Sequence, residues 1–234
     1  MIVEKRVILL NKNWSFSRAE ENGMTAPEYV CLPHSVKLTP ANSSGCRNFQ
    51  GVCKYLKSIF VPHEYKGQKL FLRFEGAMGK SALYINGNEV SRHFCGYTPF
   101  ITDITDNVNY GEENEIAITL DNSDDPLIPP GKPQDELDFS YDGGLYRSVT
   151  LTVCEPLYIT DPILANEVGG GGIFVWYTDV SESSAAVHIR AHIKNEYPEM
   201  KNYSAVIAII SPDGKKIAGT GLNSRLNAGC CEYI

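Results

Sequence analysis

The feature that most constrains the fold is a period-two alternation of apolar and polar residues, which returns in many segments while no stretch keeps a helical period. In Leu70-Phe71-Leu72-Arg73-Phe74, residues 70, 72 and 74 share one face, and in 187–193 the odd positions do. Such segments predict half-buried antiparallel strands. The clearest are 54–61, 69–75, 115–120, 147–153 and 185–194.

Turn signals between these segments strengthen the prediction. Asn86-Gly87-Asn88 separates two of them, and because Asn and Gly tolerate positive φ it predicts a tight β-hairpin. Pro212-Asp213-Gly214 predicts a second turn, between 205–211 and 215–219. Many short strands at this spacing are typical of β-sandwiches, so we expect an all-β protein.

A domain boundary is predicted near Glu155-Pro156, where one strand ends and a new set begins. Residues 1–155 would form a large sandwich and residues 157–234 a smaller, immunoglobulin-like one. A sandwich of that kind usually takes about 100 residues, and the second segment is shorter. Its last residues, 230–234, resemble the start of a strand, so we expect a truncated second domain.

Charge and hydropathy exclude several kinds of partner. The net charge is −7 and the acidic residues are scattered, whereas nucleic acids and anionic membranes require clustered Lys and Arg. The longest apolar runs, 173–177 and 205–210, fall far short of the roughly 20 residues that span a bilayer. No signal peptide is visible, which leaves the compartment open between the cytoplasm and, for a bacterial protein, the periplasm.

The seven cysteines are odd in number and irregularly spaced, and no CxxC pair indicates a zinc or redox site. We expect most of them to be buried as small hydrophobic residues. The adjacent pair Cys230-Cys231 could form a vicinal disulfide, but two reduced thiols are the expected state.

Other candidate metal ligands are few. His188 and His192 would suit a metal on a helix, but on a strand we expect them to be solvent-facing neighbours on one side. The acidic loops 103–106 and 121–125 could hold a hard cation through oxygen ligands. Solvated turns are the expected alternative for both loops.

Several motifs occur in a fixed order, and together they are more specific than any one alone. They are Leu32-Pro33-His34-Ser35-Val36, the segments 55–62, 70–90, 96–104 and 114–118, Asp138-Phe139, and Gly143-Gly144-Leu145-Tyr146-Arg147. This series resembles the N-terminal sugar-binding domain of glycoside hydrolase family 2 over most of residues 6–155. The segment that follows, with Asp161-Pro162, resembles the immunoglobulin-like second domain of that family.

The resemblance implies a jelly-roll sandwich followed by an immunoglobulin-like sandwich. In family members these precede a (β/α)₈ barrel that carries two catalytic glutamates, and retaining hydrolysis needs two carboxyls about 5 Å apart on a rigid frame. No residue of this chain is therefore nominated as catalytic, and the chain alone is expected to be inactive. The resemblance implies no cofactor within these residues, and it leaves open a cation in the active site and an oligomeric state of the whole enzyme.

In β-galactosidases of the family, a loop of the first domain contributes an Asp and an Asn to the nonreducing sugar. The Asp precedes the Gly-aromatic-Arg segment and falls on Asp138. The Asn stands three residues before a Gly that opens the next strand, and it falls on Asn48. A carboxylate accepts hydrogen bonds from sugar hydroxyls, and a carboxamide both donates and accepts. Segment 139–142 departs from the Trp-containing segment of the best-known members, and the structural alternative for Asp138 is a carboxylate that caps a turn.

Neighbouring residues are expected to have structural roles. Gly143-Gly144 should adopt backbone conformations closed to other residues, and Arg147 should pair with an acid inside the sandwich. Tyr97 and Phe100 could stack on a sugar, but packing within the domain is the expected role.

The resulting hypothesis is the non-catalytic N-terminal region of a β-galactosidase that hydrolyses terminal non-reducing β-D-galactosides, with a galactoside bound jointly with the missing barrel. The alternatives are the same region of a β-glucuronidase or β-mannosidase, a free-standing carbohydrate-binding module, and a structural sandwich used for subunit contacts. Only the placement of Asp138 and Asn48 favours a galactoside.

Overall fold

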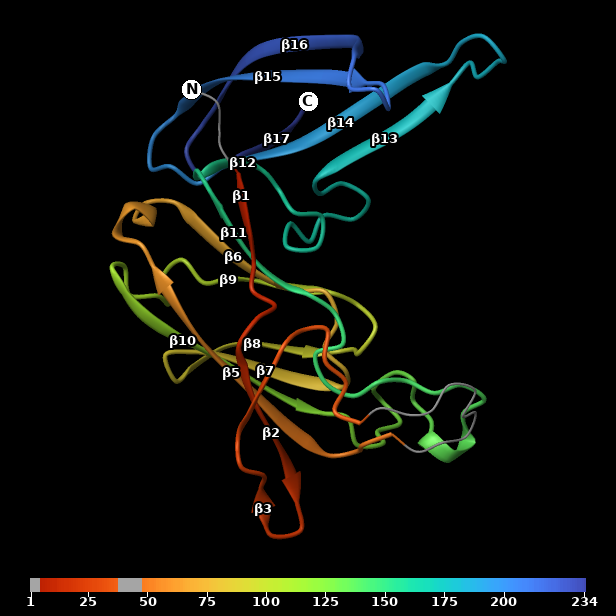
Figure 1. The fold of residues 1–234 in the computed structure, drawn as a ribbon. Helices are drawn as coiled ribbons and strands as arrows, with labels where there is room; N and C mark the ends of the chain where they lie inside the picture. Colours follow the sequence, from red (N-terminus) through yellow and green to blue (C-terminus); the bar gives the residue numbers. More distant parts are fainter. Residues whose placement is uncertain (1–4, 38–47) are drawn as a thin grey trace. The chain divides into compact units, whose positions relative to one another are not determined.

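The computed structural model describes residues 5–37 and 48–234. The described residues divide into two compact units, Lys5–Val153 and Cys154–Ile234 (Figure 1). Their regular structure is almost entirely β-strand, with two short 3-10 turns, η1 (His63–Tyr65) and η2 (Gln134–Glu136). The predicted all-β class is confirmed, whereas the domain limits 1–155 and 157–234 stay a prediction. No helix within the described ranges is long and apolar enough to cross a membrane.

The larger unit contains two sheets. One has the order β1-β11-β6-β9, and the other has the order β3-β2-β5-β10-β7-β8 with β4 paired to β2. The strands of the first sheet are β1 (Arg6–Leu9), β6 (Lys69–Phe74), β9 (Phe100–Asp103) and β11 (Val149–Cys154). Those of the second are β2 (Trp14–Glu20), β3 (Gly23–Met24), β4 (Glu28–Val30), β5 (Val52–Val61), β7 (Lys80–Ile85), β8 (Asn88–Phe94) and β10 (Glu112–Asp121).

A hydrophobic core lies between the inner faces of these sheets. Leu70, Leu72 and Phe74 of β6 are fully buried, as the alternation predicts. Tyr55 of β5 is paired in register with Ile118 of β10, and both belong to the same core. Burying one such side chain stabilises the fold by about 1.5–3 kcal/mol. The alternation therefore fixes which face of each strand points inward.

The predicted hairpin is confirmed at Asn86-Gly87, which joins β7 to β8. Both residues have positive φ, 50° and 81°, as a two-residue turn of this kind requires. The Asn86 side chain also accepts a hydrogen bond from Glu115 N at 3.0 Å. The turn is thereby held against β10.

Asn114 anchors the same end of the sheet. It is buried, and its Oδ1 accepts from Asn109 N at 2.7 Å and from Asn86 Nδ2 at 2.8 Å. Its Nδ2 donates to the carbonyls of Asn109 at 2.9 Å and Glu112 at 3.0 Å. Every hydrogen-bonding position of this carboxamide is therefore used.

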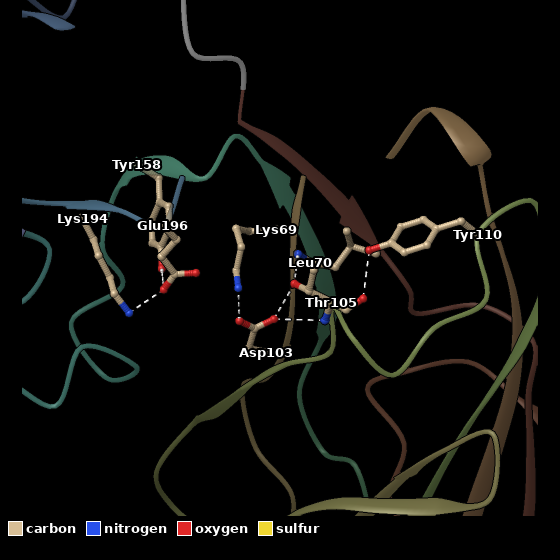
Figure 2. A network of polar contacts seen from close by, with 8 residues as sticks. All are labelled: Lys69, Leu70, Asp103, Thr105, Tyr110, Tyr158, Lys194 and Glu196. Carbon is tan, nitrogen blue, oxygen red and sulfur yellow. Dashed lines mark hydrogen bonds and ion pairs between the residues drawn. The ribbon is translucent and has the colours of Figure 1, made fainter. Parts of the chain in front are cut away.

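The acidic turn after β9 is held by protein groups (Figure 2). Lys69 Nζ lies 2.5 Å from Asp103 Oδ2, and Asp103 Oδ1 accepts from Thr105 N at 3.0 Å. Thr105 Oγ1 in turn accepts from Leu70 N at 3.0 Å, and its carbonyl accepts from the Tyr110 hydroxyl at 2.9 Å. Asp103 thus closes a turn, which was the expected alternative to a cation site.

The smaller unit is also all-β. One sheet has the order β12-β14-β13 with β17 paired to β14, and β15 and β16 form a separate hairpin. The strands are β12 (Leu157–Ile159), β13 (Ile173–Thr178), β14 (Ala186–Asn195), β15 (Lys201–Ile210), β16 (Lys216–Leu226) and β17 (Cys231–Tyr233). The predicted turn at 212–214 joins β15 to β16, and Gly214 has φ +84°. The buried core of the smaller unit includes Leu157, Ile193 and Leu226.

One side of β14 contradicts the expectation of two solvent-facing histidines. His188 is half-buried and stacks on Trp176 at 5.1 Å between ring centroids. His192 is buried, hydrogen bonds to Thr160 Oγ1 at 2.9 Å and stacks on Tyr233 at 4.7 Å. The prediction was wrong for His192 because β17 adds to this edge and places Tyr233 beside the imidazole. Nearby, Lys194 pairs with Glu196, the second group drawn in Figure 2.

The cysteines also differ from expectation. All six that lie in the described part of the chain are free thiols, and Cys230 and Cys231 are both reduced as predicted. Of these six, only Cys53 and Cys154 are buried. The others lie at strand margins rather than on inward faces, so the prediction that most would be core residues was wrong. Cys46 lies outside the described residues.

Candidate functional site

The polar loops of the larger unit gather at one end of its seven-stranded sheet. β5 and β7 begin there and β10 ends there, with Asp121 paired to Val52 on one side and to Lys80 on the other. We call this end of the sheet, with segments 48–51, 76–79 and 122–148, the site end (Figure 1). The opposite end of the same strands, with the Asn86-Gly87 turn and Asn114, is called the hairpin end.

Asn48 lies just before β5 at the site end. Its side chain is only 6% exposed, and neither Oδ1 nor Nδ2 has a hydrogen-bond partner within residues 5–37 and 48–234. A buried polar group left without a partner costs about 1–3 kcal/mol. A ligand hydroxyl that reached Asn48 would recover that energy.

Asp138 follows η2 in the long loop between β10 and β11. It is exposed, and its carboxylate forms no hydrogen bond or ion pair with the residues that the structure describes. It therefore caps no turn among them, and its oxygens are open to an incoming group. The structure brings the loops of Asp138 and Asn48 to one end of the sheet, although it records no contact between the two side chains.

Gln134 was missed by sequence reasoning. It begins η2, four residues before Asp138, and its side chain is 5% exposed. Both atoms of its carboxamide are buried without a partner in the described ranges, as in Asn48. No pattern in the sequence distinguishes this glutamine from an exposed loop residue.

The segment after Asp138 is paired like a strand with the Leu-Pro-His segment. Val36 N donates to Gly143 O at 3.1 Å, and His34 N donates to Leu145 O at 2.8 Å. These bonds hold the end of the Asp138 loop against a segment that lies far earlier in the sequence. The loop is therefore anchored close behind Asp138.

Gly144 sits at a position that requires glycine. Its φ is +98°, and a Cβ there would lie 2.4 Å from the Tyr55 hydroxyl, so the predicted conformational role is confirmed at Gly144. Its carbonyl accepts from Met78 N at 3.1 Å.

The Tyr55 hydroxyl stays protonated because burial raises its pKa. It accepts a hydrogen bond from Leu145 N at 3.3 Å and forms another with His34 Nδ1 at 2.8 Å. Burial lowers the pKa of His34, despite the opposing influence of a carboxylate, and a neutral His34 can accept this bond.

Two aromatic residues and one arginine near the site end differ in burial. Phe100 is buried and stacks on Phe74 at 4.9 Å, which confirms a packing role, whereas Tyr97 is 40% exposed. Arg147 is exposed, and its guanidinium lies 5.6 Å from the Tyr146 ring centroid with no ion pair inside the described sandwich. The predicted acid partner was wrong because β11 begins at Val149, so strand alternation does not extend to residue 147.

The site end is strongly acidic. Residues 121–142 carry seven carboxylates and one lysine, a formal net charge of −6; the acids are Asp121, Asp124, Asp125, Asp135, Glu136, Asp138 and Asp142. Lys80 offsets part of this charge, at 2.9 Å from Asp125 and 3.8 Å from Asp121. A hydrogen bond from Leu127 N and a second from Lys80 lower the pKa of Asp125. No group of three or more His, Cys, Asp or Glu in the described segments is arranged to hold a metal ion.

Comparison with known proteins assigns the fold to a class of carbohydrate-active sandwich. Residues 2–155 match the family described as glycosyl hydrolases family 2, sugar binding domain. The chain belongs to glycoside hydrolase family 2, as its motifs predict.

Individual relatives carry different substrate names. A β-glucuronidase of Formosa agariphila is 32% identical over 97% of this chain, and a β-galactosidase of Thermoanaerobacter pseudethanolicus is 31% identical over 88% of it. The solved Bacteroides uniformis β-glucuronidase 2 is 26% identical over 99% of this chain, with a TM-score of 0.82. The chain spans about a quarter of each: 25%, 25% and 27%.

Proposed function

We propose that this chain is the N-terminal, non-catalytic region of a retaining β-galactosidase, in which Asp138 and Asn48 bind the nonreducing sugar beside a separate catalytic barrel. The observation that carries the proposal is the state of these two side chains. Asp138 is exposed with no partner among the described residues, and Asn48 is a buried carboxamide with none. Both sit on loops of a sandwich that belongs to a glycosidase family.

The charge of the site end supports a neutral sugar over a uronic acid. Two carboxylates about 8 Å apart near a protein surface repel each other by about 2 kcal/mol when neither is paired with a cation. Residues 121–142 carry a net charge of −6, so a glucuronate bound beside the exposed Asp138 would meet this repulsion. A galactoside carries no charge and meets none.

A β-glucuronidase is the second candidate, because relatives similar over most of the chain, at 32% and 29% identity, bear that name. The two are separated by measuring kcat/KM of the whole enzyme for p-nitrophenyl β-D-galactoside and for the matching glucuronide. We expect the galactoside to be the better substrate. A preference for the glucuronide would contradict the galactoside assignment and leave the family assignment intact.

The role of Asp138 is tested by Asp138→Ala in the whole enzyme. Losing a hydrogen bond from a sugar hydroxyl to a charged group removes about 1.5–3 kcal/mol, so kcat/KM should fall at least about tenfold. Asp142→Ala is the matched control, since it removes an exposed carboxylate four residues away. Equal kinetics for Asp138→Ala and the control would remove Asp138 from the site.

The isolated chain should bind sugar only weakly. Two contacts of this strength barely exceed the association cost of at least about 4 kcal/mol, so calorimetry with free galactose should give a Kd of about 1 mM or weaker. Micromolar affinity would favour a free-standing binding module instead. A coding sequence that ends at Ile234 without a barrel would have the same consequence.

A further inference from the structure

Asn122 stands where the loop that carries Asn48 meets β10. It directly follows β10, and its side chain is 7% exposed. Its Nδ2 donates to Phe49 O at 2.6 Å, and its Oδ1 accepts from Gly51 N at 3.0 Å. Its backbone N also donates to Gly51 O at 3.3 Å. One residue therefore holds both sides of the short turn that follows Asn48.

The same carboxamide also contacts the end of the Asp138 loop. A Cβ built on Gly143 would lie 2.7 Å from Asn122 Nδ2 and 3.5 Å from Phe49 O. Gly143 has no positive φ, so a left-handed backbone is not the reason for glycine here. Glycine is needed there because Asn122 occupies the space, which differs from the expected conformational reason. Asn122 thus lies between the turn after Asn48 and the backbone five residues after Asp138.

The chemistry of the position suits asparagine. Its carboxamide supplies one group that donates and one that accepts, and here each faces a backbone group of the opposite kind. An ionised aspartate could still accept from Gly51 N, but it would direct an oxygen at the Phe49 carbonyl. An alanine would lose both bonds and leave two backbone groups unpaired.

We propose that Asn122 is a positioning residue of the sugar site, which fixes the Asn48 and Asp138 loops relative to each other without touching the sugar. The inference rests on the proposed function, since it concerns the same two ligand-binding side chains. Small displacements of such groups matter because a shift of about 1 Å in a reacting complex can lower the rate by about a hundredfold.

The first test compares Asn122→Asp with Asn114→Asp in the whole enzyme. Asn114 is a buried, fully hydrogen-bonded asparagine at the other end of the same strand, so its variant reports general damage to the sheet. We expect Asn122→Asp to lower kcat/KM for the galactoside about tenfold, and Asn114→Asp to leave it unchanged in folded enzyme. Thermal midpoints of both variants establish that folded protein is compared.

The pH profile adds a readout that general destabilisation would not give. A protonated carboxyl regains an O–H donor for the Phe49 carbonyl. The kcat/KM of Asn122→Asp relative to wild type at the same pH should therefore recover as the pH falls. Asn122→Ala has no such donor and should show no recovery.

A second test uses the contact with Gly143. Gly143→Ala alone should lower kcat/KM, because its Cβ displaces the Asn122 carboxamide. In an Asn122→Ala background the same change should have little further effect, since the obstructing amide is gone. Additive losses would overturn the contact, and Gly143→Ala also decides the matter if Asn122→Asp fails to fold.

The outcomes separate this inference from the function on which it rests. If Asp138→Ala lowers kcat/KM but Asn122→Asp behaves like Asn114→Asp, the positioning role is overturned and the sugar site stands. If Asp138→Ala has no effect, Asp138 is removed from the site and the positioning role falls with it. A loss in Asn122→Asp that recovers at low pH, together with non-additivity at Gly143, supports the positioning role.

Discussion

Asn114 and Asn122 stand at opposite ends of β10, and both are buried carboxamides that hold loops to the sheet. At the hairpin end, the partners of Asn114 close a compact set of turns in which its hydrogen bonds are all made. At the site end, the Asn122 carboxamide makes two hydrogen bonds, and Asn48 and Gln134 have buried amides without partners among the described residues.

In the described part of the larger unit, the buried amides without partners lie at one end only. Unpaired buried amides reduce stability by about 1–3 kcal/mol each, and the hairpin end carries no such group in its described residues. The cost is confined to the end where a ligand could supply the missing partners.

The largest effect is expected from Gly144→Ala at the site end. The substitution places a residue with a side chain at φ +98° and sets its Cβ against the Tyr55 hydroxyl. Backbone strain alone costs about 1–3 kcal/mol, and displacement of Tyr55 adds to it, so we expect a loss of about 3 kcal/mol or more in the free energy of unfolding. Urea titration followed by fluorescence measures this loss. A change below about 1 kcal/mol would show that the site end rearranges to accommodate the added Cβ.

A smaller loss is expected from Asn114→Ala at the hairpin end. The change leaves the backbone groups of Asn109 and Glu112 without their buried partner, at a cost of about 2 kcal/mol. The same urea titration applies. Kinetics of the whole enzyme should be unchanged, and a fall in kcat/KM at a temperature where the variant is folded would erase the distinction between the two ends.

Gly87→Ala should cost less again, about 1 kcal/mol, from the left-handed conformation alone. Gly87 has φ +81°, but a Cβ there would meet no atom within 4 Å. Comparison with Gly144→Ala therefore isolates steric crowding from conformational strain. Equal losses at the two glycines would mean that the Tyr55 contact contributes nothing.

The smallest effect is a pH dependence that originates at His34, which bonds Leu145 of the site end. Burial lowers the pKa of His34 below its usual 6.5, so the unfolded chain binds this proton at a higher pH than the folded chain does. The contribution of His34 to stability is therefore complete above pH 6.5 and declines as the pH falls to the folded pKa. Burial lowers the pKa of His93 as well, so the quantity to measure is the difference in unfolding free energy between wild type and His34→Gln across a pH series. A constant difference would show that His34 is not coupled to folding.

The strands and turns of this chain could be predicted because their signals are local. Alternation in residues 70–74 places Leu70, Leu72 and Phe74 on the core face, although Phe71 on the other face is also buried, and Asn86-Gly87 specifies its own turn. The family motifs likewise identified the class of protein. The placement of Asp138 and Asn48 in a sugar site stays a prediction.

The features that were not predicted depend on contacts between segments that are far apart in the sequence. Buried His192 is covered by Tyr233, more than forty positions later in the chain, and Asn122 acquires its role from Phe49, Gly51 and Gly143. In the sequence Asn122 belongs to an acidic stretch that resembles any solvated turn. No local pattern encodes such long-range neighbours, so sequence reasoning could not single these residues out.

The chain has two tryptophans, and the structure gives one to each unit. Trp14 is 0% exposed in the larger unit, with Nε1 bonded to Leu10 O at 2.6 Å, whereas Trp176 is 38% exposed in the smaller unit. A water-borne quencher such as iodide should therefore extinguish the emission of Trp176 and spare that of Trp14. Each unit carries its own optical label, and the unfolding of one can be followed in the presence of the other.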